Sequence, residues 1–379
     1  MKIEIVQVTD RKLDKAFFRL PLRIYREDPF WVPLSARIQQ KIINGRKNPA
    51  LQSSHVEYAK FLALRGREPL GRILVCQHTD YARQSGEDGA FLGCFECVED
   101  EQVASLFFHS AEKWAQLRNL NALYGPFFTL PGFEGGLPAN DQPRPYALTQ
   151  IYAPLYYAAL FRFVGFVPVR SIHTYIKQNP AAALPYLKSF ERVRQRRNAS
   201  ERYAVRPLKT QRLMEELERI RVIANDAFTG YPFFPPMTPE QIRFNFSGLD
   251  RILAKDLSFI IEDQGRAVGF ILTLYNFHPA LLELRNKPLL YRILGSIRIL
   301  KNLESCKEFV ILLIAFTKDV QGKAIPELAS WYSERIRSTK PKALYTSFVH
   351  QQNHASSNIA VRAFGMEIDH TYVIYKKVL

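Results

Sequence analysis

A basic turn near the C-terminus carries residues whose types and spacing suit phosphate binding. The apolar run 309–316 predicts a buried strand, and residues 327–337 have the pattern of a helix. The turn between them reads Gln321-Gly322-Lys323-Ala324-Ile325-Pro326. The first N–H groups of a helix have no partner within it, and the helix dipole places positive charge there. The turn therefore predicts an anion site, with an ordinary strand-to-helix connection as the alternative.

The charge of the whole chain also favours an anionic partner. Its 379 residues contain 52 Lys and Arg against 36 Asp and Glu, so the net charge is +16. A phosphorylated cofactor, an anionic membrane surface or a nucleic acid fits this imbalance, and a solubilising surface is the alternative. No nucleic-acid motif accompanies the charge, so nucleic acid is the least favoured partner.

The composition is that of a globular protein, 47% hydrophobic and 23% charged. No signal-peptide pattern opens the sequence, and no window of 18 apolar residues predicts a membrane span. We expect a cytoplasmic protein, either free or resting on the inner face of the membrane. Four cysteines do not indicate a disulfide framework. The lone pairs Cys94/Cys97 and His350/His354 lack further ligands at zinc spacing, so no metal site is predicted.

The chain divides into two halves with the same order of elements, strand, helix, three strands, helix, strand, helix, strand. Residues 1–178 form the first half and 201–379 the second, which predicts an α/β (α+β) protein with two mixed, mostly antiparallel sheets flanked by helices. The arginine-rich segment 179–200 is expected to link them, as a solvated connector or as a contact for phosphate or membrane. Because the halves can pair with each other, a monomer is as consistent with the sequence as a homodimer.

An insertion in the second half, residues 287–301, has the pattern of a basic amphipathic helix. Leu290, Ile293, Leu294, Ile297 and Leu300 share one face, and Lys287, Arg292, Arg298 and Lys301 flank it. Such a helix could lie on an anionic membrane or cover an acyl-chain tunnel. A helix packed into the core is the alternative.

The order strand, Gln-Gly-Lys-Ala turn, helix resembles the acyl-CoA pyrophosphate loop of the GNAT acyltransferase superfamily. The resemblance extends to one bacterial tandem-GNAT family, the YghO-like proteins, which include a ceramide synthase. It spans nearly the whole chain. The matching segments are Tyr25-Arg-Glu-Asp-Pro-Phe-Trp-Val-Pro33, Gly71-Arg-Ile73, Ala111-Glu-Lys-Trp114, Gly125-Pro126, Tyr156-Tyr157, Gly165-Phe166, Pro235-Pro-Met-Thr238, Val268-Gly-Phe270 and Thr371-Tyr-Val-Ile-Tyr375.

The resemblance implies an acyl-CoA-dependent N-acyltransferase that uses acyl-CoA or acetyl-CoA as substrate. The acceptor would be a small-molecule or lipid-like amine, including a long-chain, sphingoid-like amine. The first half has no phosphate turn. Acidic residues Glu99, Asp100 and Glu101 stand in its place, so we expect this half to have lost the cofactor and to shape the substrate cleft.

Site residues follow from the same resemblance. The cofactor phosphates would meet Gln321, Gly322, Lys323, Ala324 and Ile325, and the thioester oxygen a backbone N–H near Ala315 or Phe316. Asn353 would contact the cofactor, and His278, His350 and Glu134 are candidate bases.

The sequence also departs from the superfamily pattern. Many GNAT enzymes have a tyrosine as general acid where this chain has Val361, and Pro326 removes one N–H from the turn. The alternative function is therefore an inactive GNAT-like protein that binds acyl-CoA or an amphiphile.

Overall fold

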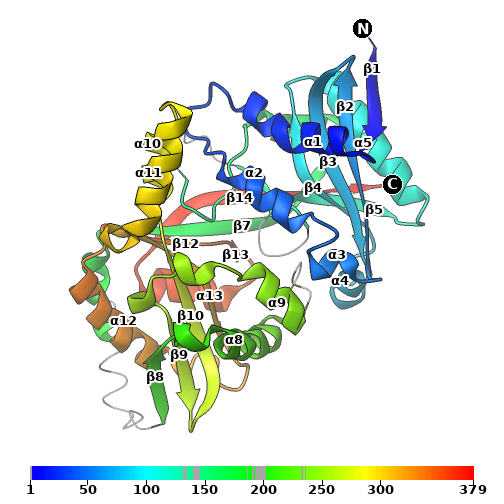
Figure 1. Ribbon diagram of the computed structural model, residues 1–379. Coiled ribbons are helices and arrows are strands. Elements are labelled where there is room, and N and C mark those ends of the chain that lie inside the picture. The colour runs from blue at the N-terminus through cyan, green and yellow to red at the C-terminus, as the bar shows by residue number, and fades with distance from the viewer. Residues whose placement is uncertain are drawn as a thin grey trace.

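One mixed β-sheet with helices on both faces runs through the whole molecule (Figure 1). The computed structural model describes residues 2–130, 135–139, 146–185, 187–189, 192, 202–231, 234 and 236–379. Half of the expected linker, 11 of its 22 residues, and the candidate base Glu134 therefore lie outside the described residues.

The elements of the first half follow the order that the sequence predicts, with additional short helices. They are β1 (Ile3–Gln7), α1 (Arg11–Ile24), α2 (Leu34–Ile42), α3 (Pro49–Gln52), β2 (Val56–Arg65), β3 (Glu68–His78), α4 (Thr79–Ser85), β4 (Ala90–Cys97), α5 (Glu101–Gln116), β5 (Ala122–Phe127), β6 (Leu137–Pro138), α6 (Tyr156–Phe163) and β7 (Val167–Gln178).

The second half repeats this order. Its elements are β8 (Tyr203–Pro207), α8 (Leu213–Phe228), α9 (Pro239–Asn245), β9 (Phe259–Asp263), β10 (Arg266–Tyr275), α10 (His278–Glu283), α11 (Leu289–Lys301), β11 (Glu308–Phe316), α12 (Ile325–Thr339), β12 (Ala343–Thr346), β13 (Val349–His350), α13 (His354–Asn358), a π-helical turn (Ile359–Ala363) and β14 (Glu367–Val378).

Local sequence explains why the main elements form. Asp100 caps α5 by accepting hydrogen bonds from the N–H groups of Gln102 and Val103, and the helix buries seven apolar side chains against the sheet. Strands β9 and β10 form a hairpin across Gln264 and Gly265, whose φ angles of 49° and 82° suit the turn that matches strand twist. The mixed sheet with flanking helices confirms the predicted fold class.

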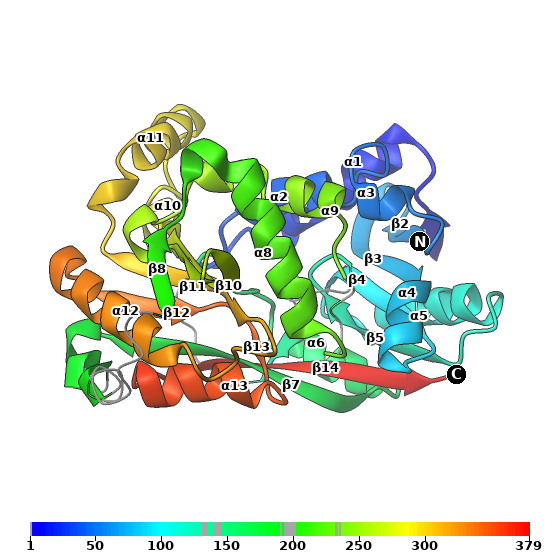
Figure 2. The same ribbon diagram turned by 90° about the horizontal axis from the view of Figure 1, so that it is seen from below.

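The last strands of the two halves are exchanged. The sheet order is β1-β2-β3-β4-β5-β14-β7-β12-β11-β10-β9-β8, so β14 lies beside β5 of the first half and β7 beside β12 of the second. Figure 2 shows β7 and β14 running side by side along the length of the molecule. Only the pairs β4–β5 and β11–β12 are parallel among the described strands. The exchange joins the two halves into one sheet, while the division at 178 and 201 stays a prediction.

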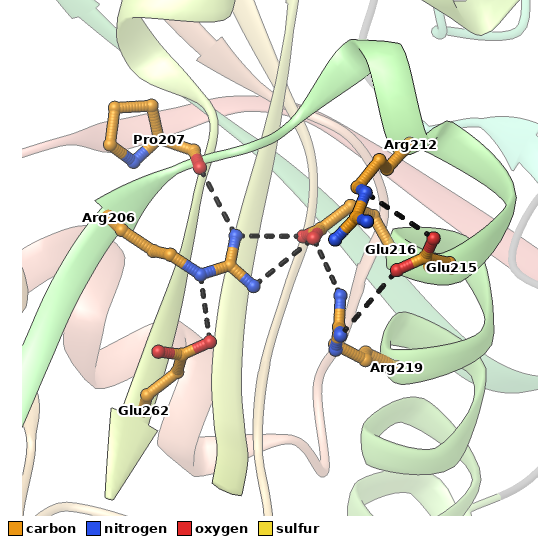
Figure 3. Close-up of polar contacts among 7 residues, drawn as sticks. All are labelled: Arg206, Pro207, Arg212, Glu215, Glu216, Arg219 and Glu262. Atoms are coloured by element: carbon orange, nitrogen blue, oxygen red, sulfur yellow. Dashed lines mark hydrogen bonds and ion pairs between the residues drawn. The ribbon is translucent and has the colours of Figure 1, made fainter. Parts of the chain in front are cut away.

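A buried ion-pair cluster fixes the outer strand of the second half (Figure 3). Glu216 of α8 is fully buried and accepts hydrogen bonds from Arg206 of β8 at 3.0 and 3.1 Å and from Arg219 at 2.7 Å. Arg206 also donates to Glu262 of β9 at 2.8 Å. Because both carboxylate oxygens of Glu216 are bonded, its charge is stabilised despite burial. The cluster therefore ties α8 to the edge of the sheet.

Candidate functional site

Strands β11 and β12 separate beyond their first four paired residues. Their parallel pairing begins at Glu308 and Ala343 and ends at Ile311 and Thr346. The remaining part of β11, residues 312–316, has no strand partner on this side among the described residues. The separation leaves an opening in the middle of the sheet, where a ligand can reach the backbone of β11.

The turn after β11 presents unused backbone donors at the start of α12. Among the described residues, the N–H groups of Gly322, Ala324 and Ile325 donate to no protein acceptor, and no side chain caps the helix. Gly322 has φ of +80° and open space where a Cβ would stand. Asp226 of α8 anchors the turn by accepting the N–H of Lys318 at 2.7 Å. This geometry is typical of an anion site.

Two adjoining cavities lie along the opening. One has a volume of about 260 Å³ and reaches the turn, and the other, of about 60 Å³, lies between β11 and β13. They share lining residues, and the smaller one is largely apolar. The side chains common to both belong to Phe228, Tyr231, Ile314, Asn353, Ser356 and Ile359.

The structure brings most of the predicted cofactor residues to one cavity. The residues that line it are Ala315, Phe316, Gln321, Gly322, Ile325 and Asn353. Two others do not line it. Ala324 is fully buried in the core beneath the turn, and the Lys323 ammonium donates to the carbonyl oxygen of Asp319 at 2.8 Å. Their assignment to the cofactor stays a prediction.

The candidate bases are placed differently. His350 lines the smaller cavity, where burial and the nearby Arg170 guanidinium lower its pKa to about 4. His278 begins α10 and lines neither cavity. Its Nδ1 is buried without a hydrogen-bond partner among the described residues, and burial lowers its pKa to about 4. The structure thus groups His350, rather than His278, with Asn353.

Tyr231 is a site residue that the sequence analysis did not single out. It follows the C-terminal end of α8, lines both cavities and donates a long hydrogen bond of 3.5 Å to the Asn353 side chain. Asn353 also accepts the N–H of Ser356 at 3.1 Å and so caps α13. Val361, by contrast, is 47% exposed. A phenol therefore reaches the site from the segment after α8 instead of from the π-helical turn that carries Val361.

The corresponding region of the first half is filled by side chains. Counting from Gly165 and Gly365, which both precede a last strand, the offset is 365 − 165 = 200, so Tyr156 and Tyr157 correspond to Ser356 and Ser357. The Tyr156 hydroxyl donates to the carbonyl oxygen of Cys97 at 2.7 Å. Tyr157 accepts the Cys97 N–H at 3.1 Å and donates to Glu96 at 2.8 Å. Two tyrosines thus bond to the end of β4, whereas a cavity lies beside the end of β11.

A buried carboxylate completes the filled region. Glu96 accepts hydrogen bonds from Tyr25 and Tyr157 at 2.8 Å each and from Arg72 at 3.3 Å. Arg72 is itself fully buried and donates to Gln39 and to the carbonyl oxygen of Phe17. Because these donors already occupy the carboxylate, the cluster has a structural role.

Comparisons with known proteins agree with this architecture. The chain is similar to the bacterial ceramide synthase of Caulobacter vibrioides, with 25% identity over 378 residues that cover 96% of this chain and 94% of the relative. It is 24% identical over 372 residues to Protein YghO of Escherichia coli K12, covering 96% and 92%. No protein-family model matches the chain.

Among solved structures, a tandem GNAT protein from the clavulanic acid biosynthesis pathway aligns with a TM-score of 0.54 and 10% identity. The alignment covers 100% of this chain and 98% of that one. The structural likeness shows that the two halves form a tandem GNAT fold, as the sequence predicts. No helix among the described residues is long and apolar enough to cross a membrane.

Proposed function

We propose that this tandem GNAT protein is an acyl-CoA-dependent N-acyltransferase whose acceptor is an amine on a long hydrocarbon chain. The observation that carries the proposal is the contrast between the two halves. The second half has free N–H groups at a helix N-terminus beside a cavity, and the first half has tyrosines and a capped helix in the same place. A pyrophosphate fits the open site, since backbone donors and the helix dipole favour its charge.

The residues around the cavities suit acyl transfer. The amine nitrogen would attack the thioester carbonyl carbon, so that a C–N bond forms, the C–S bond breaks and CoA leaves as a thiolate. The carbonyl oxygen gains charge, for which a backbone N–H at Ala315 or Phe316 is the proposed donor. His350 is neutral at pH 7 because its pKa is lowered to about 4. It can accept the amine proton as the C–N bond forms and the nitrogen becomes acidic.

Two further roles are part of the proposal. Asn353 would hold the cofactor or acceptor, because its side chain lies in the wall of both cavities. The apolar lining of the smaller cavity, which includes Phe228, Phe348 and Met366, favours an acyl chain longer than acetyl. His278 and Glu134 remain candidate bases, one outside both cavities and one outside the described residues.

The acceptor is proposed from the similarity to a protein named ceramide synthase, which makes a lipid-like amine the first class to test. Such an amine resides in a membrane, so the enzyme would work in the cytoplasm in peripheral contact with an anionic lipid surface. The second candidate function is an acyl-CoA-binding protein without catalysis. The exposed Val361, where many GNAT enzymes have their general acid, favours this alternative.

Thermal unfolding with CoA, acetyl-CoA and palmitoyl-CoA tests the binding site. A ligand present at about 100 times its Kd stabilises the folded state by about 2.7 kcal/mol. Gly322→Asp should abolish this stabilisation, since it places a carboxylate among the proposed phosphate donors. Gly248→Asp is the matched control, because Gly248 also has a φ of +83° and open space around its missing Cβ. Stabilisation by none of the three ligands would remove the acyl-CoA site.

Release of free CoA thiol from palmitoyl-CoA and sphinganine then tests catalysis. The active enzyme should release thiol in proportion to the N-acylated product. Ligand stabilisation without thiol release for any long-chain or short-chain amine would select the binding protein over the transferase.

A further inference from the structure

Helix α11 presents an apolar face to solvent, unlike the other long helices. Helices α1, α5 and α8 each bury at least four side chains, whereas α11 buries none. Six of its apolar side chains are between 47% and 70% exposed. They are Leu289, Leu290, Ile293, Leu294, Ile297 and Leu300. At about 100° per residue these six fall within an arc of about 140°, so they form one continuous face.

The opposite side of the helix is the one that contacts the protein. Gly295 and Ile299 are only partly exposed and lie on the other side of the helical wheel. A Cβ at Gly295 would meet the Leu284 side chain at 2.7 Å, so the glycine lets α11 pack closely against the end of α10. Figure 1 shows α10 and α11 together at the edge of the molecule, away from the strands. The apolar face is thus held outward by packing. The alternative of a helix packed into the core is therefore wrong.

Four cations lie on or next to α11. At the same 100° per residue, Lys287 and Arg298 border the apolar face, Lys301 lies within its arc at the end of the helix, and the partly buried Arg292 lies on the opposite side. Lys287, Arg292, Arg298 and Lys301 make no ion pair with another described residue, and no Asp or Glu occurs between 284 and 303. A second copy of α11 would bring these cations against like charges, which disfavours a symmetric dimer through this face. A partner that is apolar within and anionic at its surface satisfies both features. An anionic lipid bilayer has this character.

We propose that α11 docks the protein on an anionic lipid bilayer, with its six apolar side chains among the acyl chains and its cations at the headgroups. Long basic side chains can extend their charges to the headgroups while their methylenes stay in the apolar layer. The purpose of this docking, access to an amine held in the membrane, rests on the proposed function, but the docking itself does not require catalysis.

Flotation with phospholipid vesicles tests the docking. The protein should float with vesicles of 70% phosphatidylcholine and 30% phosphatidylglycerol, and more weakly with phosphatidylcholine alone. Leu290→Glu/Leu294→Glu should reduce binding at least tenfold, because it places two charges in the apolar face. The matched control is Leu117→Glu/Met214→Glu, since both residues are more than half exposed, one directly after α5 and the other on α8. Undiminished binding of the α11 variant would overturn the proposal.

The cations give a second, independent test. A basic residue near an anionic surface strengthens binding about fivefold, so Arg298→Gln/Lys301→Gln should weaken it about 25-fold on the anionic vesicles. It should change little on phosphatidylcholine. The control Arg83→Gln/Arg212→Gln removes two exposed guanidinium groups elsewhere. Equal losses for the two double variants would mean that net charge, rather than α11, attracts the protein, and would contradict the proposal.

Two measurements separate this inference from the proposed function. Stabilisation by CoA without vesicles should be the same in the α11 variants and the wild-type protein. Vesicle binding without CoA stabilisation would leave the docking intact and remove the acyltransferase. Light scattering tests the alternative that a second copy of the protein covers the apolar face of α11. A dimer that Leu290→Glu/Leu294→Glu dissociates, together with no vesicle binding, would assign the face to a second copy and overturn the membrane proposal.

Discussion

The strand-to-helix turns of the two halves begin alike and end differently. After β4, the N–H of Val98 donates to the carbonyl oxygen of Leu70 at 2.9 Å, and after β11, Thr317 donates to Val268 at 2.8 Å. The first turn then needs three residues, 98–100, before α5 begins, whereas the second has eight, 317–324, before α12. Asp100 uses the free donors of α5, and no side chain caps α12. The longer, uncapped turn is the one that leaves donors for a ligand.

The difference teaches that two halves with the same order of elements can differ at one place, where the first is filled by side chains and the second keeps a cavity beside free backbone donors. The first half fills this place with its own polar groups, namely Tyr156, Tyr157 and the Glu96 carboxylate. The Glu96 carboxylate accepts hydrogen bonds from Tyr25, Tyr157 and Arg72, and a buried carboxylate with such partners adds order to the core. The second half has serines at the positions of the tyrosines, and the space beside them stays open.

The largest expected effect on stability comes from removing the cation of the buried cluster in the first half. Arg72→Met should lower the free energy of unfolding by about 3–5 kcal/mol, because it leaves Glu96 buried without its cation. Chemical denaturation measures the loss. Arg118→Met is the control, since its ion pair with Glu57 is exposed and worth at most about 1 kcal/mol. CoA should still stabilise the folded Arg72→Met protein. Loss of the stabilisation by CoA would show that the buried cluster of the first half also supports the ligand site of the second half.

The next effect comes from making the open site resemble the filled one. Ser356→Tyr introduces the side chain of Tyr156 into the cavity wall and should remove the ligand stabilisation of about 2.7 kcal/mol seen at 100 times the Kd. Calorimetry with and without CoA measures it. Ser338→Tyr, at an exposed position on α12, is the control. Unchanged CoA binding in a folded Ser356→Tyr protein would contradict the proposed position of the ligand.

A smaller effect depends on pH. Burial lowers the pKa of His350 from 6.5 to about 4. Between these two pH values the unfolded chain binds a proton at His350 and the folded state does not. The free energy of unfolding is therefore not reduced by this histidine above pH 6.5, and it decreases as the pH falls toward 4. The slope is at most about 1.4 kcal/mol per pH unit. His350→Gln should flatten the measured dependence, whereas the exposed His109→Gln should not. Parallel curves for His350→Gln and the wild-type protein would contradict this assignment.

Local patterns let the sequence predict the main elements of the site. The apolar run became β11, the small-residue turn became residues 317–324, and the amphipathic period became α12, because each depends on neighbours along the chain. The resemblance placed Asn353 in the same region, and the cavity includes it. Acidic residues in the first turn were expected to repel phosphate. In the structure Asp100 caps α5, a role that the amphipathic pattern of the residues after it predicts from the sequence.

Long-range packing explains what the sequence did not predict. The exchange of β7 and β14 depends on pairing between strands some 200 residues apart, which no local period encodes. Tyr231 reaches Asn353 from a different part of the chain, so only the fold brings them together. The contrast between Tyr156 and Ser356 was available in the sequence. Aligning the halves on Gly165 and Gly365 would have revealed it.

The smallest expected effect comes from removing the helix cap of the first half. This change tests whether the cap alone makes the first turn unable to bind CoA. Asp100→Ala frees the N–H groups of Gln102 and Val103 and should cost about 1 kcal/mol of stability, measured by urea denaturation. The variant then has an uncapped α5 that resembles α12. It should still not bind CoA in the first half, because Tyr157 and Glu96 occupy the space beside the helix.

Combining this change with Gly322→Asp isolates the first half, since the second site is then disabled. Conversion of Asp100 to Ala in that background should leave CoA without any stabilising effect. Renewed stabilisation would show that a free helix N-terminus suffices for binding in this fold, and that the tyrosines of α6 do not exclude the ligand. Its absence would mean that the cavity is required together with the donors, which the proposed site beside β11 combines.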